Sequence, residues 1–194
     1  MTTGRETRED TRMEERTRWL VLIYRLPREP SRPRVAAWRK LKTLGAVYLQ
    51  DGVAALPEDA VTREQLEWLQ LNVREAGGEA TLWEARPGTL AEEKRLVEAF
   101  RSSREEAYRA ITQAAGRVRR KAEMGAPLKG GAEALVKELA KLEKEFRAER
   151  RRDYFRSPLR KEAAAALKDA RRVVREAGAA GEEPEDLGGA GGGP

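Results

Sequence analysis

Apolar residues along this chain occur either in short runs or at spacings of three and four, and the two arrangements predict different elements. The run WLVLIYRL at residues 19–26 is short, rich in aliphatic and aromatic residues and ended by Pro27, so it predicts a buried strand. The runs AVYLQ and VAAL flank Asp51-Gly52, a dipeptide typical of hairpin turns. The segment EATLWEA at residues 79–85 predicts a fourth strand.

Two helices are expected between these strands. The first follows Ser31, a good N-cap residue, and ends at Gly45, a good C-cap residue. The second opens on Thr62 and Gln65 as a capping box and ends at residues 77–78, which are both glycine. Their apolar residues recur at helical spacing: Val35, Trp38, Leu41, Leu44, Leu66, Leu69 and Val73. The order βαββαβ predicts a ferredoxin-like domain, an antiparallel sheet with both helices on one face.

The rest of the chain predicts helices. Residues 89–123 lack proline and carry apolar residues at near-helical spacing, and residues 128–155 repeat leucine almost as a coiled coil does. A break at Ser157-Pro158 precedes a last helix over residues 159–176. The predicted fold class is therefore α+β: a ferredoxin-like domain followed by a long α-helical hairpin and a C-terminal helix. An isolated hairpin is marginal, so we expect it to dock or to form a homodimer.

Charge divides the chain in the same places. Residues 1–86 carry 15 basic and 14 acidic side chains, residues 87–177 carry 24 and 15, and the rest carries four acids and no base. Residues 1–17 and the glycine-rich stretch from 178 have too few apolar groups to order themselves. We expect a disordered arm at 1–17, the ferredoxin-like domain at 18–87, a basic helical region at 88–177 and a disordered tail at 178–194.

Two absences narrow the chemistry. The chain has no cysteine and no histidine, so disulfides, thiol nucleophiles, imidazole bases and Cys/His metal sites are excluded. We find no nucleotide-binding or nucleophile motif, so no catalytic residue, cofactor or metal site is predicted, and no enzyme. The N-terminus lacks the apolar core of a signal peptide and no run is long enough to span a bilayer, which favours a cytoplasmic protein without membrane contact.

Clustered bases on the predicted helices favour nucleic acid as a partner. Runs at 117–121 and 150–152, with Arg147, Arg160 and Lys161 nearby, suit the phosphates of a nucleic acid. The candidate DNA-binding residues are Arg117, Arg119, Arg120, Lys121, Arg150, Arg151 and Arg152. The alternative is a solvated surface of acid–base pairs on an adaptor whose helical hairpin binds a partner protein. A continuous basic stripe favours DNA, and scattered arginines paired with acids favour the adaptor.

A second group of bases surrounds the start of the first predicted helix. Guanidinium groups, free backbone amides and the helix dipole together favour a tetrahedral oxyanion, phosphate and sulfate included. The candidate oxyanion-binding residues are Arg25, Arg28, Arg32 and Arg34. The alternative is that they are ordinary loop arginines. The four tryptophans, Trp19, Trp38, Trp68 and Trp83, are expected in the core or on the sheet rather than as base-stacking platforms.

The chain resembles the N-terminal domain of the ChrB family of chromate-resistance proteins. The resemblance lies in IYRLP, WRKLKTLGA, LQDGV, GGEA, RDYF and SPLR, in this order, and covers about residues 18–176. It implies a regulator of a chromate-efflux operon that responds to chromate and binds promoter DNA. In the RDYF segment, Arg152, Tyr154 and Phe155 are expected to be structural and to dock the hairpin onto the first domain.

Two departures qualify what the resemblance implies. The first domain is also similar to the ferredoxin-like module of phenylacetate-type repressors and of the small CRISPR-associated nuclease, which has an aspartate where this chain has Arg25. Binding is therefore expected rather than nuclease activity. ChrB proteins carry a further C-terminal domain, whereas this sequence ends in a glycine-rich tail, so we expect DNA or partner binding without it. Any chromate sensing here depends on arginine, because there is no thiol.

Overall fold

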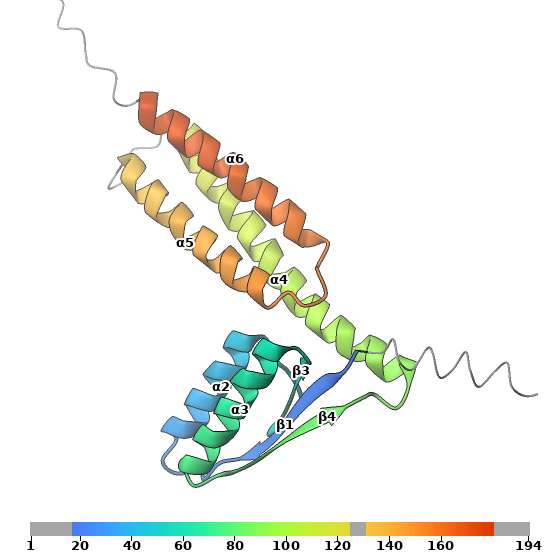
Figure 1. Cartoon of the computed structure of the whole chain (residues 1–194). Coiled ribbons are helices and arrows are strands. Elements are labelled where there is room, and N and C mark those ends of the chain that lie inside the picture. The colour runs from blue at the N-terminus through green and yellow to red at the C-terminus, as the bar shows by residue number, and fades with distance from the viewer. Residues whose placement is uncertain (1–16, 125–130, 181–194) are drawn as a thin grey trace, which may run out of the picture. The chain divides into compact units, whose positions relative to one another are not determined.

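The computed structural model describes residues 17–124 and 131–180 and confirms the predicted α+β class (Figure 1). The first six elements are β1 (Trp19–Arg25), α2 (Arg32–Leu44), β2 (Val47–Gln50), β3 (Val53–Pro57), α3 (Ala60–Glu75) and β4 (Glu79–Ala85). Three long helices follow: α4 (Leu90–Glu123), α5 (Gly131–Arg151) and α6 (Leu159–Ala180). The predicted N-terminal arm lies almost wholly outside the described residues, as does the tail beyond residue 180. Residues 178–180, predicted to begin the tail, are the end of α6.

The sheet has the strand order β2-β3-β1-β4, and every neighbouring pair is antiparallel. In the middle of β1, Leu22 lies opposite Ala54 on one side and Leu82 on the other. Helices α2 and α3 cover one face of this sheet (Figure 1). The order βαββαβ with the first and third strands in the centre is the predicted ferredoxin-like arrangement.

The two helix starts differ from the sequence prediction. Helix α3 begins one turn earlier than expected, because its N-cap is Asp59, which accepts a hydrogen bond from the amide of Thr62 at 2.8 Å. The Asp59 amide in turn donates to the Thr62 hydroxyl at 2.9 Å, so Thr62 closes the capping box instead of opening it with Gln65. Ser31 precedes α2 as expected, but its backbone is helical and its side chain makes no capping bond.

The chain forms two compact units, and each is described by itself. The first comprises residues up to Ser103 together with Arg152–Arg156, and the second comprises Arg104–Arg151 and the residues from Ser157. The division therefore falls inside α4, rather than at residue 87 where the sequence analysis set the domain boundary. The RDYF segment belongs to the first unit, although it follows α5 in the chain.

Aromatic packing holds the RDYF segment in the first unit. The ring of Phe155 lies 5.8 Å from Trp19 and 5.6 Å from Phe100, measured between centroids. The hydroxyl of Tyr154 donates to the Leu44 carbonyl at 2.8 Å. Trp19 is 1% exposed, as predicted for a core residue. Trp83 is 58% exposed and lies on the sheet, in β4, which agrees with the expectation of a core or sheet position. Trp38 and Trp68 lie on helices and are 47% and 58% exposed, which corrects the expectation for these two.

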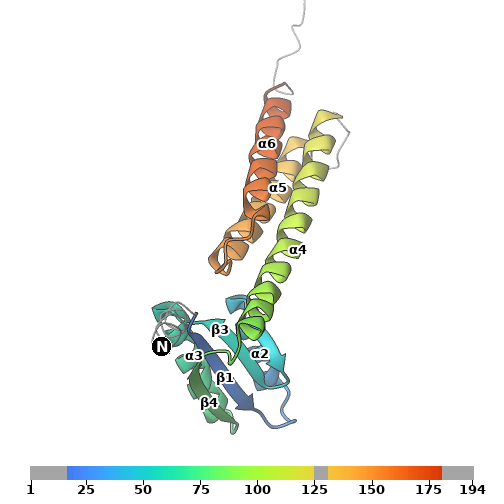
Figure 2. The ribbon, with the colours of Figure 1, turned by 90° about the vertical axis from the view of Figure 1, so that its right-hand side faces the viewer.

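The second unit is a three-helix bundle, in which α6 packs on the predicted hairpin of α4 and α5. Helices α4, α5 and α6 run side by side in both views (Figures 1 and 2). One apolar cluster takes residues from all three helices, including Tyr108 of α4, Leu139 of α5 and Leu167 of α6. Because α6 covers the apolar seam that an isolated hairpin would expose, the bundle provides within the unit the burial that the sequence analysis expected from docking or dimerisation.

Candidate nucleic-acid and anion sites

Helix α5 carries a row of exposed bases opposite its leucine seam. Leu135, Leu139 and Leu142 are buried in the bundle. Residues three or four apart share a face of a helix, so the bases that follow this spacing form a row on the outer side. These are Lys137, Lys141, Lys144, Arg147 and Arg151, and all are exposed.

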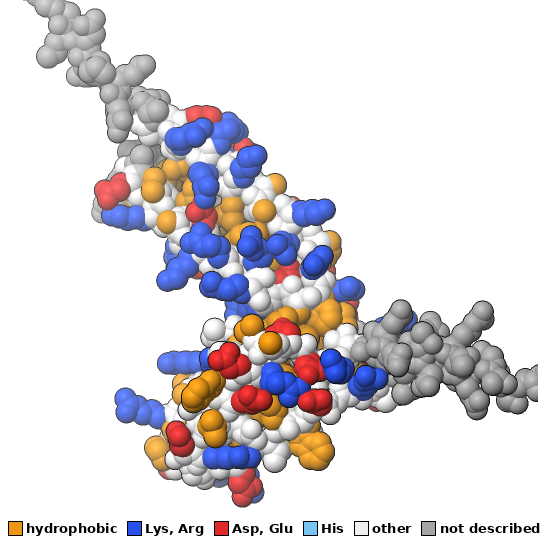
Figure 3. All heavy atoms as spheres, viewed as in Figure 1, with side chains coloured by type: hydrophobic (Ala, Val, Ile, Leu, Met, Phe, Trp, Pro, Cys, Tyr) orange, Lys and Arg blue, Asp and Glu red, His pale blue; other side chains and the backbone are white. Residues whose placement is uncertain are grey.

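Helix α6 carries a second row. Lys161, Lys168 and Arg175 are exposed and seven residues apart, about two turns or 10 Å along the axis. Arg147 and Lys168 line one shallow groove of about 190 Å³ between α5 and α6, so the two rows lie on one face. Figure 3 shows lysine and arginine gathered over α5 and α6 on this side of the unit. We call this surface, with residues 144, 147, 151, 161, 168, 171 and 175, the α5–α6 face.

Ion pairs are few on the α5–α6 face. Arg171 donates from Nε to Glu143 at 2.8 Å across the two helices. The other six cations form no ion pair with any carboxylate of the described residues: Lys144, Arg147, Arg151, Lys161, Lys168 and Arg175. Unpaired guanidinium and ammonium groups in two rows suit a polyanion such as the phosphate backbone of DNA.

The bases predicted on α4 are arranged differently. Nη1 of Arg119 lies 3.0 Å from Oδ2 of Asp169 on α6, and Nζ of Lys121 lies 2.8 Å from Oε2 of Glu138 on α5. These pairs cross between helices and leave each cation half-exposed. Arg117 and Arg120 are exposed and make no ion pair among the described residues. The cluster is therefore split: two members tie the bundle together and two face solvent.

The predicted bases at the end of α5 also separate. Arg150 and Arg151 are exposed in the last turn. Arg152 belongs to the first unit, where its Nη1 donates to the carbonyl of Lys42 at 3.0 Å. The sequence analysis therefore located part of the basic surface but missed Lys144, Lys168 and Arg175. Their spacing relative to the leucines was the feature that could have found them.

Two of the four loop arginines share a groove in the first unit. Arg25 at the end of β1 and Arg34 in the first turn of α2 line a hollow of about 580 Å³. Arg28 and Arg32 are exposed and lie outside its lining. None of the four is ion-paired among the described residues. The structure thus brings together one pair, Arg25 and Arg34, out of the predicted set.

Aromatic groups complete the wall of this groove. The hydroxyls of Tyr24 and Tyr48 lie 3.2 Å apart, and both residues line the hollow. Burial raises the pKa of Tyr48 above its usual range, and the hydrogen bond with Tyr24 adds to the shift. The Tyr48 hydroxyl therefore stays protonated at neutral pH. One of the two hydroxyls donates to the other, which leaves one O–H to donate to an anion. Trp38 stands at the wall with the Lys42 ammonium 4.9 Å from its ring centroid.

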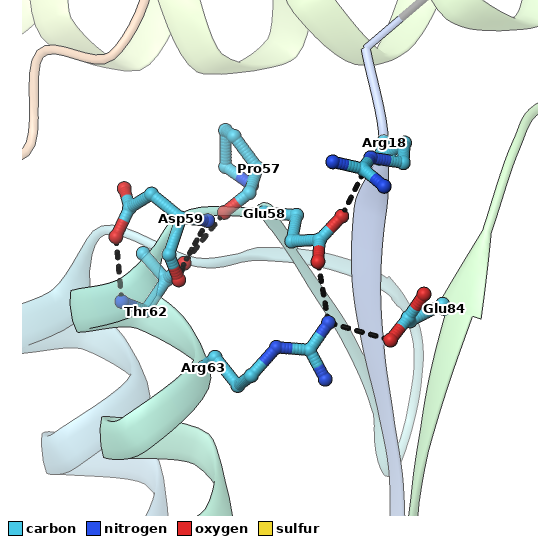
Figure 4. A network of polar contacts seen from close by, with 7 residues as sticks. All are labelled: Arg18, Pro57, Glu58, Asp59, Thr62, Arg63 and Glu84. Carbon is cyan, nitrogen blue, oxygen red and sulfur yellow. Dashed lines mark hydrogen bonds and ion pairs between the residues drawn. The ribbon is translucent and has the colours of Figure 1, made fainter.

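A third polar cluster is structural. Figure 4 shows Arg63 of α3 between Glu58, just after β3, and Glu84 of β4. Nε of Arg18 lies 3.0 Å from the other oxygen of Glu58. Each cation in this network pairs with a carboxylate, and the pairs of Arg63 connect α3 to the end of β3 and to β4.

The described residues contain no group of three or more carboxylates placed to hold a metal ion. None of the helices described is both long enough and apolar enough to cross a membrane.

Comparison with known proteins finds one family and one protein to which this chain is similar. The family described as "Protein ChrB, N-terminal" matches residues 34–179, which include nearly all of α2 and α6 and every element between them. A "Protein ChrB" of Cupriavidus metallidurans is 37% identical over 62 residues, 32% of this chain and 19% of that protein. The match thus spans about a fifth of that relative's length. No solved structure matches the chain.

Proposed function

Because the chain belongs to the family of ChrB N-terminal domains, we propose that it is a DNA-binding transcriptional regulator of the chromate-resistance type. Family membership supports a role connected with chromate resistance. DNA contact goes further than membership and depends on one observation, the two rows of unpaired cations on the α5–α6 face.

The physical argument is electrostatic. A cation placed at a DNA phosphate releases a condensed counterion, which favours binding and makes it weaken steeply with salt. Arg147 and Lys168 are the best-placed pair because they line the same groove from two helices. Such contacts position a protein on the duplex without reading its sequence. Arg117, Arg120 and Arg150 remain proposed phosphate contacts, since they are exposed. Arg119, Lys121 and Arg152 are weaker candidates because their side chains already have partners.

The test compares the protein's own upstream DNA with a scrambled duplex of equal length over a salt series. We expect R147Q/K168Q to weaken binding and to reduce the slope of log K against log salt by about two, near 0.9 for each phosphate that is no longer neutralised. The matched control is K94Q/R109Q, which removes the same charge from two exposed residues of α4 outside the α5–α6 face. Equal weakening in the two variants would contradict a defined phosphate-binding face.

The proposal includes an anion response. The pair Arg25 and Arg34, with the hydrogen-bonded hydroxyls of Tyr24 and Tyr48 beside it, offers charge and a hydrogen bond to a tetrahedral oxyanion. Chromate is the anion that the family suggests. Chromate that weakens DNA binding where an equal concentration of sulfate does not would support selective sensing. Equal effects of the two anions would show that the response is a general effect of ionic strength and not selective sensing.

The adaptor is the second candidate, and a specific observation favours it. Arg119 and Lys121 pair with acids across the bundle, as expected of bases that stabilise helices rather than bind nucleic acid. Failure to bind either duplex at moderate salt would overturn the DNA proposal in favour of this one.

A further inference from the structure

The α5–α6 face is a cationic surface with one apolar hollow. Six cations there lack a carboxylate partner among the described residues. The groove between the helices is lined by the apolar residues Phe146, Ala164 and Leu167 and by the bases Arg147 and Lys168. A complementary segment would therefore carry several carboxylates and one apolar side chain.

The residues that directly follow α6 have this composition. The sequence from 181 reads GEEPEDL, with four acids, no base, and Leu187 as the only large apolar residue between 181 and 194. Helix α6 ends at Ala180, so these residues are tethered to the same helix that carries Lys168 and Arg175. Tethering makes the contact intramolecular, with an effective concentration in the millimolar range for short linkers.

The distances along the chain agree. Arg175 and Lys168 lie five and twelve residues before the end of α6, about 8 and 18 Å along the axis at about 1.5 Å per residue. An extended chain advances about 3.3 Å per residue, so a segment that turned back at Gly181 would span about 17 Å to Asp186 and about 20 Å to Leu187. Asp186 would then come close to the level of Lys168, and Leu187 would come level with Leu167 in the groove. Lys161, nineteen residues before the helix end, is out of reach of the four acids.

We propose that residues 181–187 dock on the α5–α6 face, with their carboxylates along Arg175 and Lys168 and Leu187 in the groove. The docked segment acts as an internal polyanion that competes with nucleic acid for this surface. The competition rests on the proposed function, whereas the docking does not.

Docking is tested without DNA. Because the chain has no cysteine, Ala190→Cys gives a single site for a nitroxide spin label whose effect on backbone amide signals reports proximity. At low salt we expect loss of signal for residues 164–175 of α6 and 143–147 of α5. The loss is expected to fade at high salt, because screening shortens from about 10 Å at 0.1 M to about 3 Å at 1 M. It is also expected to shrink in E182Q/E183Q/E185Q/D186N.

Two results would overturn the docking. One is an absence of signal loss on these helices at low salt. The other is an equal loss in the neutralised variant, which would show that carboxylates do not hold the segment. A further variant, Leu187→Ser, is expected to reduce the loss around 164–167 more than around 175.

Competition is tested with the same neutralised variant and duplex DNA. We expect binding about fivefold tighter than wild type, the low end of typical coupling between two ligands. The matched control E64Q/E67Q/E75Q/E79Q changes the net charge equally at four exposed acids of the first unit. Equal tightening in the control would assign the effect to net charge and overturn competition. If the segment docks but the protein binds no DNA, only the proposed function is refuted. If the protein binds DNA but the segment does not dock, only this inference is refuted.

Discussion

At the scale of single residues, two glycines that look alike in the sequence have different surroundings. Gly45 and Gly77 both end helices with positive φ, 75° and 76°. A Cβ added at Gly45 would lie 2.8 Å from Cβ of Arg152, whereas one at Gly77 meets nothing within 4 Å. The Gly45 position is therefore fixed both by its backbone and by the RDYF segment that packs against it.

Alanine at these two positions separates the two effects. We expect Gly77→Ala to lower the free energy of unfolding by about 1 kcal/mol, the cost of a left-handed alanine. Gly45→Ala is expected to cost at least about 1 kcal/mol more, because the Arg152 backbone must shift to admit the methyl group. Denaturant unfolding measures both. Equal destabilisation would show that the packing of Arg152 against Gly45 contributes nothing.

Asp169 provides a test by pH. Hydrogen bonds from Arg172 first, and then from Arg119, lower the pKa of Asp169 below its usual value of 3.8. A carboxyl whose pKa falls on folding stabilises the folded state above its unfolded-state pKa and loses that effect as pH drops through the folded value. We expect Asp169→Asn to melt below wild type at pH 7, with the gap closing as the pH falls below 3.8. A gap that stays constant over this range would contradict the ion pair.

At the scale of elements, capping depends on where the chain enters a helix. Asp59 has an extended backbone, which aims its carboxylate at the first-turn amide of Thr62. Ser31 is already helical, so its hydroxyl does not reach the equivalent amide. By residue type, Ser31 and Asp59 are equally good N-caps, and the backbone angles of the two residues decide which of them makes the capping bond.

The matched pair Asp59→Ala and Ser31→Ala tests this difference. Removal of the Asp59 carboxylate is expected to lower the free energy of unfolding by about 1 kcal/mol, the usual value of an N-cap bond. Ser31→Ala is expected to change it by less than about 0.5 kcal/mol, as for an exposed surface position. Chemical denaturation followed by circular dichroism gives both values, and a larger effect at Ser31 would refute the assignment.

At the scale of the whole molecule, the proposed function assigns anion response and DNA contact to different units. The first unit holds the groove with Arg25 and Arg34, and the second holds the α5–α6 face. Under this proposal, effector and DNA engage separate sets of residues, so variants are expected to remove one activity while leaving the other.

Neutralising the groove is expected to abolish the response to chromate alone. R25Q/R34Q is expected to bind upstream DNA as wild type does in the absence of chromate, because neither residue belongs to the α5–α6 face. Added chromate is then expected to leave that binding unchanged. The control R28Q/R32Q removes the same charge outside the groove and is expected to keep the response. Loss of the response in both variants would point to the general charge of the loop rather than to the groove.

The order of strands and helices, the turn at Asp51-Gly52 and the helix end at Gly45 followed from the sequence, because each depends on neighbouring residues. Three things were decided only by the tertiary structure. Trp38, Trp68 and Trp83 are about half exposed, because the packing of the elements, and not the residue type, decides which helix or sheet face is covered. Arg119 and Lys121 are paired because α5 and α6 place acids beside them. Lys144, Arg147 and Lys168 form one face because two helices distant in sequence pack together, and the spacing within one helix carries no information about its neighbour's register.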